Sequence, residues 1–221
     1  MAGLVVVEGL IGVGKTTLCR ILEAEWGARL VLEPADDNPF LSRFYADPER
    51  FALPAQLFYM AARFRQQEEL RQPTLFERVT VCDYLWAKDR LFAEMTLRGD
   101  DLGLYERFAE LLGQRAPRPD VVLFLDATTP TIRARIGRRG IPAEQVIAAD
   151  YLDDLRRRYY RLWDRYTDAP VHVLRTDGVD YVNDRGARAA VVGMLEGWLG
   201  GRPAPGAPPV YGQAPSALFR D

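Results

Sequence analysis

The sequence predicts an α/β fold in which a five-stranded parallel sheet is flanked by helices. Short apolar runs, which are typical of buried parallel strands, alternate along the chain with longer segments of helical periodicity. The 221 residues are 48% hydrophobic, which is enough for one sizeable core. Because strands and helices alternate, a parallel sheet with helices on its faces is the expected arrangement.

The strands are predicted from apolar runs such as Leu4-Val5-Val6-Val7. Such runs place strands at 3–8, 29–33, 79–83, 121–126 and 171–175. The segments between them carry helical patterns, which place helices at 14–26, 39–45, 53–71, 86–97, 101–114, 130–137, 150–167 and 185–199. Residues 1–199 are therefore expected to form a single domain. Residues 200–221 are rich in Gly, Pro and Ala, and we expect a flexible tail there.

Between the first strand and the first helix lies the segment G-L-I-G-V-G-K-T, residues 9–16. It fits the pattern G-x-x-x-x-G-K-[ST], the P-loop, in which backbone N–H groups and a helix N-terminus surround a phosphate. Lys15 is expected to contact the outer phosphates, and Thr16 to hold a Mg²⁺ ion. A chance match is disfavoured because a strand precedes the motif and a helix follows it. The predicted nucleotide-binding residues are Gly9, Gly12, Gly14, Lys15, Thr16 and Thr17.

Carboxylates follow three of the predicted strands, at the sheet edge where ligands of such folds bind. Glu33, in the pair Glu33-Pro34, is placed to take a proton from an attacking hydroxyl, although an ordinary loop acid fits the spacing equally well. Asp83 and Asp126 each end an apolar strand, and either suits a Mg²⁺-associated carboxylate. The motifs do not decide between these two aspartates.

Two helical segments carry further polar side chains. One face of the helix predicted at 53–71 carries polar and apolar side chains, which fits binding of a planar ligand that needs both hydrogen bonds and stacking. The alternative interpretation of this face is a solvated helix edge. Its members are Gln56, Met60, Arg63 and Gln67. Arginines cluster in the segment 133–139, R-A-R-I-G-R-R. They suit a clamp on a transferring phosphoryl group, with a basic surface helix as the alternative.

Composition and charge restrict the class of protein. A net charge of -2 and a pI near 5.6 argue against a nucleic-acid-binding surface. Cys19 and Cys82 are interpreted as buried apolar residues, and the single histidine, His172, as a structural strand residue. Glu8 interrupts the first apolar run, which resembles no signal peptide, and no stretch has the length of a membrane span. We expect a cytoplasmic protein without a membrane or nucleic-acid partner.

Taken together, these motifs resemble the deoxynucleoside kinase family, in particular its bacterial purine-deoxynucleoside branch. The resemblance runs from residue 3 to about 175. Besides the P-loop and the pair Glu33-Pro34, it rests on the Q-x₆-R spacing of Gln56 and Arg63 and on the segment 83–90, D-Y-L-W-A-K-D-R. Further matching segments are Asn38-Pro39-Phe40-Leu41, Phe44-Tyr45, Asp47-Pro48-Glu49-Arg50-Phe51, Arg135, Arg139-Gly140, Glu144 and Asp150-Tyr151-Leu152.

The resemblance implies a P-loop kinase fold with an arginine-bearing lid, and it implies catalytic roles. Glu33 would be the general base on the sugar 5′-hydroxyl. Lys15 and the lid arginines Arg135 and Arg139 would contact the phosphates. Asp83 would take the acidic, Mg²⁺-linked place of the family.

Roles in substrate binding are implied by the same resemblance. Tyr45 and Glu144 would hold the 3′-hydroxyl of the sugar. Gln56 would form a hydrogen bond with the base, while Arg63 with Asp89 would set the base preference. Family members are commonly dimers, so the resemblance also implies a homodimer.

One position departs from the family pattern. Most members carry a D/E-R-S motif where this chain has Asp83-Tyr84-Leu85, so Tyr84 replaces the arginine of the motif. The lid arginines, or Arg90, are expected to compensate. Ile141 stands where a further lid arginine is often found. The D-Y pair is similar to the deoxyguanosine kinase side of the bacterial family, so deoxyguanosine is the expected substrate, with deoxyadenosine or deoxycytidine as alternatives.

The expected function is phosphorylation of a purine deoxynucleoside by ATP with Mg²⁺, in nucleotide salvage. A nucleoside monophosphate kinase of the thymidylate kinase type would share the P-loop and the lid. It would also need a cationic site for an acceptor phosphate, for which Arg63 is the only strong candidate on the acceptor helix, and the resemblance assigns Arg63 to the base. A P-loop regulatory switch is the third hypothesis. It is weakened because the chain has no guanine-reading N-K-x-D motif and because a switch should lack a small-acceptor pocket.

Overall fold

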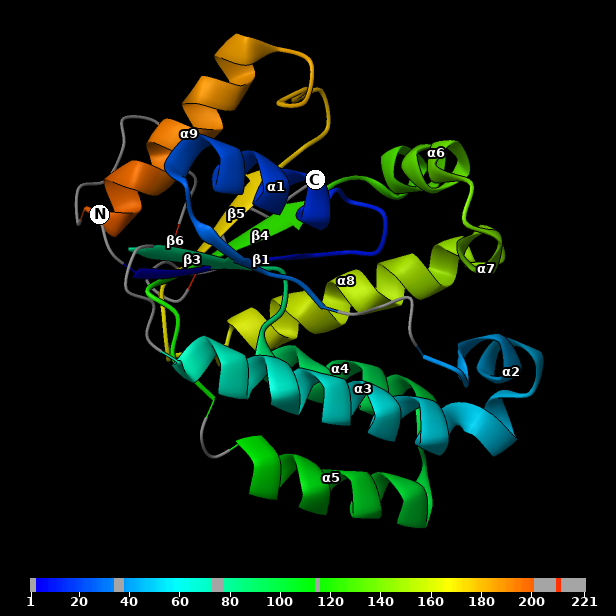
Figure 1. The fold of residues 1–221 in the computed structure, drawn as a ribbon. Coiled ribbons are helices and arrows are strands. Elements are labelled where there is room, and N and C mark those ends of the chain that lie inside the picture. Colours follow the sequence, from blue (N-terminus) through cyan, green and yellow to red (C-terminus); the bar gives the residue numbers. More distant parts are fainter. Residues whose placement is uncertain (1–2, 34–37, 73–77, 114–115, 201–209, 212–221) are drawn as a thin grey trace.

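A sheet of six strands forms the centre of the structure (Figure 1). The computed structural model describes residues 3–33, 38–72, 78–113, 116–200 and 210–211. The strands lie in the order β2-β3-β1-β4-β5-β6, and β1 to β5 are parallel to their neighbours, which confirms the predicted five-stranded parallel sheet. Their bounds are Gly3–Gly9 for β1, Arg29–Val31 for β2, Val79–Cys82 for β3, Val121–Asp126 for β4, Val171–Arg175 for β5 and Val210–Tyr211 for β6.

The short strand β6 adds an antiparallel edge that the sequence does not predict. It places Tyr211 opposite Val171 and Val210 opposite His172. Both strand residues belong to the segment for which a flexible tail is predicted. Residues 201–209 and 212–221 lie outside the described residues, so for them the tail remains a prediction.

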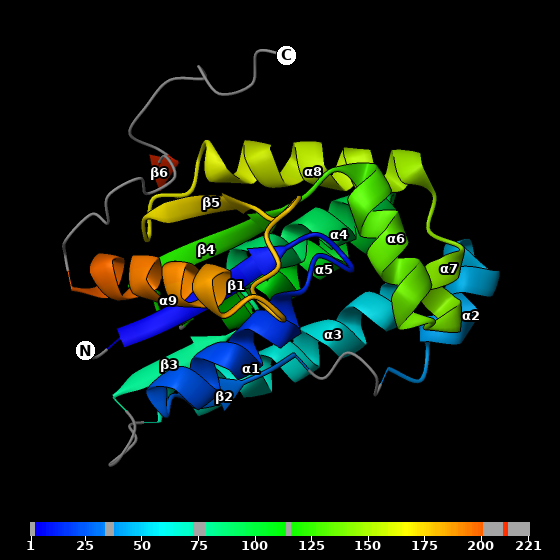
Figure 2. The ribbon, with the colours of Figure 1, turned by 90° about the horizontal axis from the view of Figure 1, so that it is seen from above.

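Helices cover both faces of the sheet. In Figure 1, α1 and α9 lie on one face, while α3, α4 and α8 lie on the other, with α5 outermost beside α3. Figure 2 shows α2, α6 and α7 gathered beyond one end of the sheet, where β1 leads into the P-loop. The helices are α1 Lys15–Trp26, α2 Leu41–Ala46, α3 Pro48–Arg71, α4 Asp89–Thr96, α5 Gly99–Gly113, α6 Thr129–Arg139, α7 Pro142–Gln145, α8 Ala149–Trp163 and α9 Arg185–Leu199.

Most predicted helices are present, and the exceptions have local causes. Helix α3 begins at Pro48, five residues before the predicted start at 53, because the Asp47 carboxylate accepts a hydrogen bond from the N–H of Arg50 and proline suits a first helical position. The helix predicted at 86–97 is divided into a 3₁₀ turn, Trp86–Lys88, and α4. The short helix α7 is not predicted.

The core covers both faces of the sheet, and its aromatic part lies between the sheet and α8. Phe124 of β4 is fully buried, and its ring packs against Tyr159, Tyr160 and Trp163 at centroid distances of 4.9, 5.7 and 5.4 Å. The predicted structural role of the histidine fits its position in β5, where it is buried and stacks on Trp198 of α9. Both cysteines are buried and free, as expected.

No helix among residues 3–200, wherever these are described, combines the length and the apolar character that a membrane crossing requires.

Replacing Phe124 by alanine tests the core. We expect Phe124→Ala to lower the free energy of unfolding by about 3–5 kcal/mol, because a cavity replaces a fully packed ring. Val146→Ala is the control, since that side chain is 70% exposed and should change stability by less than about 0.5 kcal/mol. Urea unfolding followed by far-UV circular dichroism measures both, and similar effects of the two substitutions would contradict the packing described.

Candidate active site

The P-loop joins β1 to α1 and encloses a site for phosphate. Gly12 has a φ of +77°, and a Cβ atom on it would lie 2.6 Å from Cγ1 of Ile136. The first turn of α1 begins directly after Gly14, which also has a positive φ. A side chain at either glycine would therefore force the loop out of shape. The ammonium of Lys15 donates hydrogen bonds to the carbonyl oxygens of Gly9 at 2.9 Å and Leu10 at 3.1 Å.

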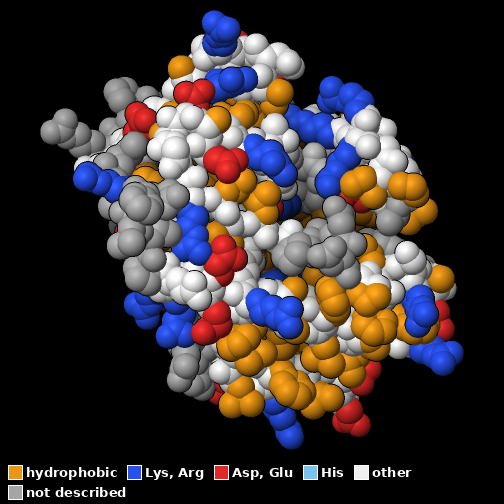
Figure 3. All heavy atoms as spheres, in the orientation of Figure 1, with side chains coloured by type: hydrophobic (Ala, Val, Ile, Leu, Met, Phe, Trp, Pro, Cys, Tyr) orange, Lys and Arg blue, Asp and Glu red, His pale blue; other side chains and the backbone are white. Residues whose placement is uncertain are grey.

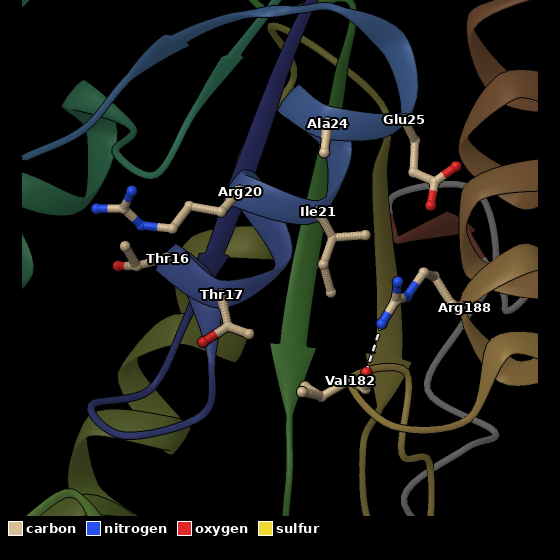
Figure 4. Close-up of a pocket in the computed structure, with 8 residues that line it drawn as sticks. All are labelled: Thr16, Thr17, Arg20, Ile21, Ala24, Glu25, Val182 and Arg188. Atoms are coloured by element: carbon tan, nitrogen blue, oxygen red, sulfur yellow. Dashed lines mark hydrogen bonds between the residues drawn. The ribbon is translucent and has the colours of Figure 1, made fainter.

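The side chains of Thr16 and Thr17 leave the first turn of α1 at the mouth of this loop (Figure 4). Thr16 and Arg20 extend to one side of α1, whereas Ile21 extends toward Val182 and Arg188. Arg188 holds that neighbouring segment in place by donating to the carbonyl oxygens of Tyr181 and Val182. Thr16 and Thr17 both line an outer pocket between α1 and this segment, and Thr16 also lines a second cavity, which contains Lys15 and Glu33.

The hydroxyl of Thr16 and the carboxylate of Asp83 form an oxygen-rich corner of the cavity. Thr16 Oγ1 lies 3.2 Å from Asp83 Oδ2. Burial raises the pKa of Asp83, so the nearby cations do not fully compensate its charge. A hydroxyl, a carboxylate and room for phosphate oxygens suit Mg²⁺, which keeps several waters and uses few protein ligands. In the described part of the chain there is no group of three or more His, Cys, Asp or Glu that would form a self-sufficient metal site.

Asp126, the alternative carboxylate, has other partners. Arg156 of α8 forms an ion pair with Asp126 Oδ1 at 3.0 Å, and the hydroxyl of Tyr160 donates to Oδ2 at 2.7 Å. Asp126 borders a different pocket, formed with Thr128, Thr129 and the arginines of α8 and β5. The geometry thus favours Asp83 for the Mg²⁺-linked role, a choice that the sequence motifs leave open.

Glu33 follows β2 and lies among cations. Arg63 Nε donates to Glu33 Oε1 at 2.7 Å, and Lys88 Nζ lies 3.5 Å from Glu33 Oε2. Burial alone would raise the pKa of Glu33, but Arg63 and Lys88 outweigh it and lower the pKa to about 2. The N–H of Glu33 donates to Asp83 Oδ1 at 2.7 Å, which ties the proposed base to the proposed metal ligand. Glu33 is therefore ionised and held in one orientation.

Arg63 connects Glu33 to Asp89. Its guanidinium forms a buried ion pair with Asp89, which also accepts a hydrogen bond from the hydroxyl of Tyr105. The rings of Tyr59 and Tyr84 lie 5.1 and 4.8 Å from the guanidinium carbon. Arg63 and Asp89, which the resemblance pairs, thus occur as a pair in the structure.

One cavity, of about 260 Å³, contains most of the residues selected from the sequence. Gln56 donates to Thr96 Oγ1 at 3.1 Å, while its Oε1 is buried and has no hydrogen-bond partner among the described residues. Such an orphaned acceptor is expected to bind a donor on a ligand. The cavity is lined by Gly9, Gly12, Lys15, Thr16, Glu33, Gln56, Arg63, Asp83, Lys88, Arg139, Glu144 and neighbouring apolar side chains.

The predicted lid residues occupy two different environments. Arg139 lies on the last turn of α6 and forms a 3.1 Å ion pair with Glu144 across the mouth of the cavity. Arg135 donates instead to the carbonyl oxygens of Val13 and Thr176 and to Thr176 Oγ1, so its guanidinium supports the P-loop from outside the cavity. Phosphate contacts of both arginines remain predictions. The side chain of Tyr45 lies outside the described residues.

Two residues of the site are not singled out by the sequence motifs. Glu8, in the middle of β1, is completely buried, and its Oε1 lies 3.1 Å from the ammonium of Lys88. A glutamate inside an apolar strand is the signal that points to Glu8. Lys88 is 3% exposed and lies in the cavity, whereas Arg90, the expected substitute for the missing arginine, is 67% exposed and pairs with Glu94 and Glu106. The position of Arg90 does not favour it as the substitute, and compensation by the lid arginines stays a prediction.

A phosphate-binding loop that shares one small polar cavity with an ionised carboxylate defines a P-loop phosphotransferase with a small acceptor. The sequence model of the family "Deoxynucleoside kinase" matches residues 5–197. The chain belongs to the deoxynucleoside kinase family.

Individual relatives agree with this assignment. The chain is 33% identical over 159 residues to a deoxyguanosine kinase of Bacillus subtilis, covering 72% of this chain and 77% of the relative. It is 29% identical over 202 residues to a deoxyadenosine/deoxycytidine kinase of the same organism, covering 87% and 91%. A structure of deoxyadenosine kinase from M. mycoides with bound dATP has a similar fold, with a TM-score of 0.74 at 20% identity, covering 87% of this chain and 99% of that one.

Removing the guanidinium of Arg63 tests the buried ion pairs. We expect Arg63→Met to lower the free energy of unfolding at pH 7 by about 3–5 kcal/mol, because Glu33 and Asp89 would stay buried without it. The stability that Glu33 contributes is complete above its unfolded pKa of 4.5 and is lost as the pH falls toward its folded pKa of about 2. The deficit of the variant should therefore shrink as the pH falls below about 4.5.

Urea unfolding of both proteins at several pH values measures this deficit. Arg71→Met is the matched control on the same helix, since the ion pair of Arg71 with Glu68 is exposed and worth little. A deficit of Arg63→Met that is equally small, or that does not depend on pH, would contradict the described network.

Proposed function

We propose that the chain transfers the γ-phosphoryl group of ATP to the 5′-hydroxyl of a purine deoxynucleoside, with deoxyguanosine preferred. The observation that carries this proposal is the shared cavity, in which Lys15 of the P-loop faces Glu33, Gln56 and Arg63. Donor and acceptor can therefore meet without crossing bulk water, which favours transfer to the hydroxyl over hydrolysis of ATP.

In this proposal Glu33 orients the 5′-hydroxyl and accepts its proton while the hydroxyl oxygen bonds to the γ-phosphorus. The bond between that phosphorus and the bridging oxygen of the leaving diphosphate breaks in the same transfer. Lys15 and the P-loop N–H groups would bind the phosphates, and Arg139, which lines the same cavity, would contact them from α6. Thr16 and Asp83 would hold Mg²⁺, which supplies charge neutralisation on the phosphates when bound.

Arg63 and Gln56 support the preference for guanine. The O6 and N7 atoms of guanine are adjacent acceptors that suit a guanidinium, and Arg63 has further N–H donors besides those used by Glu33 and Asp89. The unpartnered Oε1 of Gln56 would accept from an N–H of the base. Glu144 would hold the 3′-hydroxyl, with Tyr45 as the proposed second group. The relative at 33% identity is also a deoxyguanosine kinase.

A panel of acceptors with ATP and Mg²⁺ tests the substrate. We expect deoxyguanosine to give the highest kcat/KM, followed by deoxyadenosine and deoxycytidine, with nucleoside diphosphate formation from dGMP absent. Chromatographic detection of each product measures this order. A preference for deoxyadenosine or deoxycytidine would reject the guanine assignment, and efficient phosphorylation of dGMP would favour the monophosphate kinase.

Glu33→Gln tests the proposed base within the same assay. It keeps the size of the side chain but removes its charge, so kcat should fall by about 10²–10⁴-fold while ATP binding, measured by calorimetry, stays nearly intact. Glu25→Gln, on the outer side of α1, is a control of the same chemistry and should behave as the unsubstituted protein. Turnover of Glu33→Gln close to that of the control would remove Glu33 from the role of base.

We further propose that the chain forms a homodimer through α3 and α5. Leu104, Phe108 and Leu111 follow one face of α5 and are 44%, 43% and 68% exposed. Figure 3 shows apolar side chains gathered over α3 and α5, on the side facing the viewer. A contiguous apolar face of this kind is typical of an interface, and a second copy would cover it with an identical helix pair.

A double substitution tests this interface. Phe108→Asp with Leu111→Asp is expected to convert a dimer of 25.0 kDa chains into monomers, because charges would be buried at its centre. Size-exclusion chromatography with light scattering gives the mass. Glu110→Gln, on another face of α5, should leave the dimer intact. A monomeric unsubstituted protein, or a dimer that survives both charges, would contradict the proposed surface.

A further inference from the structure

Lys88 lies buried between two carboxylates on the floor of the catalytic cavity. Its ammonium is 3.1 Å from Glu8 Oε1 and 3.5 Å from Glu33 Oε2, and the ring of Tyr84 lies 4.8 Å away. The side chain of Lys88 is 3% exposed, and that of Glu8 is completely buried. A buried ammonium is stable only with such partners, so the arrangement restricts Lys88 to this position.

Glu8 does not need Lys88 for its hydrogen bonds. It accepts them from the N–H of Leu85 at 2.7 Å, the hydroxyl of Tyr159 at 3.0 Å and the N–H of Gly9 at 3.2 Å. These donors fix the glutamate in β1, and the glutamate in turn fixes the ammonium. Glu8 is thus a rigid support from which Lys88 reaches the cavity.

Two cationic side chains, Arg63 and Lys88, form ion pairs with Glu33, and they differ in their other contacts. Arg63 forms part of the proposed base-binding site and also pairs with Asp89, so its N–H donors are shared among Glu33, Asp89 and a bound base. Lys88 has no proposed contact with the base, and its ion-pair partners are the carboxylates of Glu8 and Glu33. Lys88 is therefore the cation whose ion pairs join Glu33 to the sheet, through Glu8.

We propose that Lys88 is a positioning residue, which holds the carboxylate of Glu33 toward the acceptor hydroxyl. This inference rests on the proposed role of Glu33 as the base. The cation reaches Glu33 from the 3₁₀ turn Trp86–Lys88 rather than from the position directly after Asp83.

Lys88→Met tests the role of the ammonium. This variant also leaves the buried carboxylate of Glu8 without a cation, which could destabilise the fold, so it is compared with the double variant Glu8→Gln, Lys88→Met. The double variant leaves no unpaired carboxylate at position 8, so it should fold even if the single variant does not. In both we expect kcat to fall by about tenfold to a hundredfold while the KM for ATP changes by less than about twofold. Lys88→Arg keeps the charge and should retain more of kcat than Lys88→Met.

Arg90→Met is the matched control. The exposed side chain of Arg90 pairs with Glu94 and Glu106 outside the cavity, so the activity of this variant should be unchanged.

Restoration of kcat in the double variant would overturn the proposal, because Lys88 would then serve only to neutralise Glu8. Equal losses in Lys88→Arg and Lys88→Met would also overturn it. If Glu33→Gln is inactive while the double variant is fully active, the positioning role alone fails. If no deoxynucleoside is phosphorylated by the unsubstituted protein, the proposed function fails and takes this inference with it.

Discussion

Buried charge beside the P-loop is the constraint on which the rest of the site depends. Ionised groups removed from water destabilise a fold unless each has a partner of opposite sign at close range. The carboxylates of the cluster are Glu8, Glu33, Asp83 and Asp89, and its cations are Lys15, Arg63 and Lys88. The members come from β1, α1, α3, and the segments that follow β2 and β3. The cluster contains four carboxylates and three cations, so a divalent cation bound with nucleotide would balance the remaining negative charge.

The parallel sheet makes this cluster possible. Because β1 lies between β3 and β4, the ends of strands that are far apart in the sequence lie side by side. Helices α3 and α8 close the cluster from the opposite face, with Arg63 and Tyr159 directed into it. Rigid elements thus position the polar groups, while the apolar residues around them keep water out. This division is common where charge must be held for phosphoryl transfer.

The strands and the P-loop could be predicted because each depends on a local sequence pattern. Strand runs and the P-loop depend on neighbouring residues, and the predicted strand ends differ from the structure by at most two residues. The apolar pattern places the start of α3 too late because this start depends on Asp47 and Pro48, a capping signal outside that pattern. The partners of Asp126 on α8 are thirty or more residues away in sequence, so no motif reveals that this carboxylate is already paired.

Lys88 and Arg90 show where a sequence pattern fails. The sequence pattern predicts a continuous helix from residue 86, but the chain forms a 3₁₀ turn before α4. A 3₁₀ turn has fewer residues per turn than an α-helix, so it changes which side chain faces inward. Lys88 is turned into the protein and Arg90 into solvent. The sequence therefore shows that Lys88 is present, but the direction of its side chain depends on the backbone geometry of the 3₁₀ turn.

Arg135 has a consequence for motion. Its guanidinium bonds α6 to the carbonyl oxygen of Val13 in the P-loop and to Thr176 after β5. A swing of α6 must either carry the P-loop along or break these bonds. The position of α6 and the geometry of the P-loop are thereby coupled through one side chain.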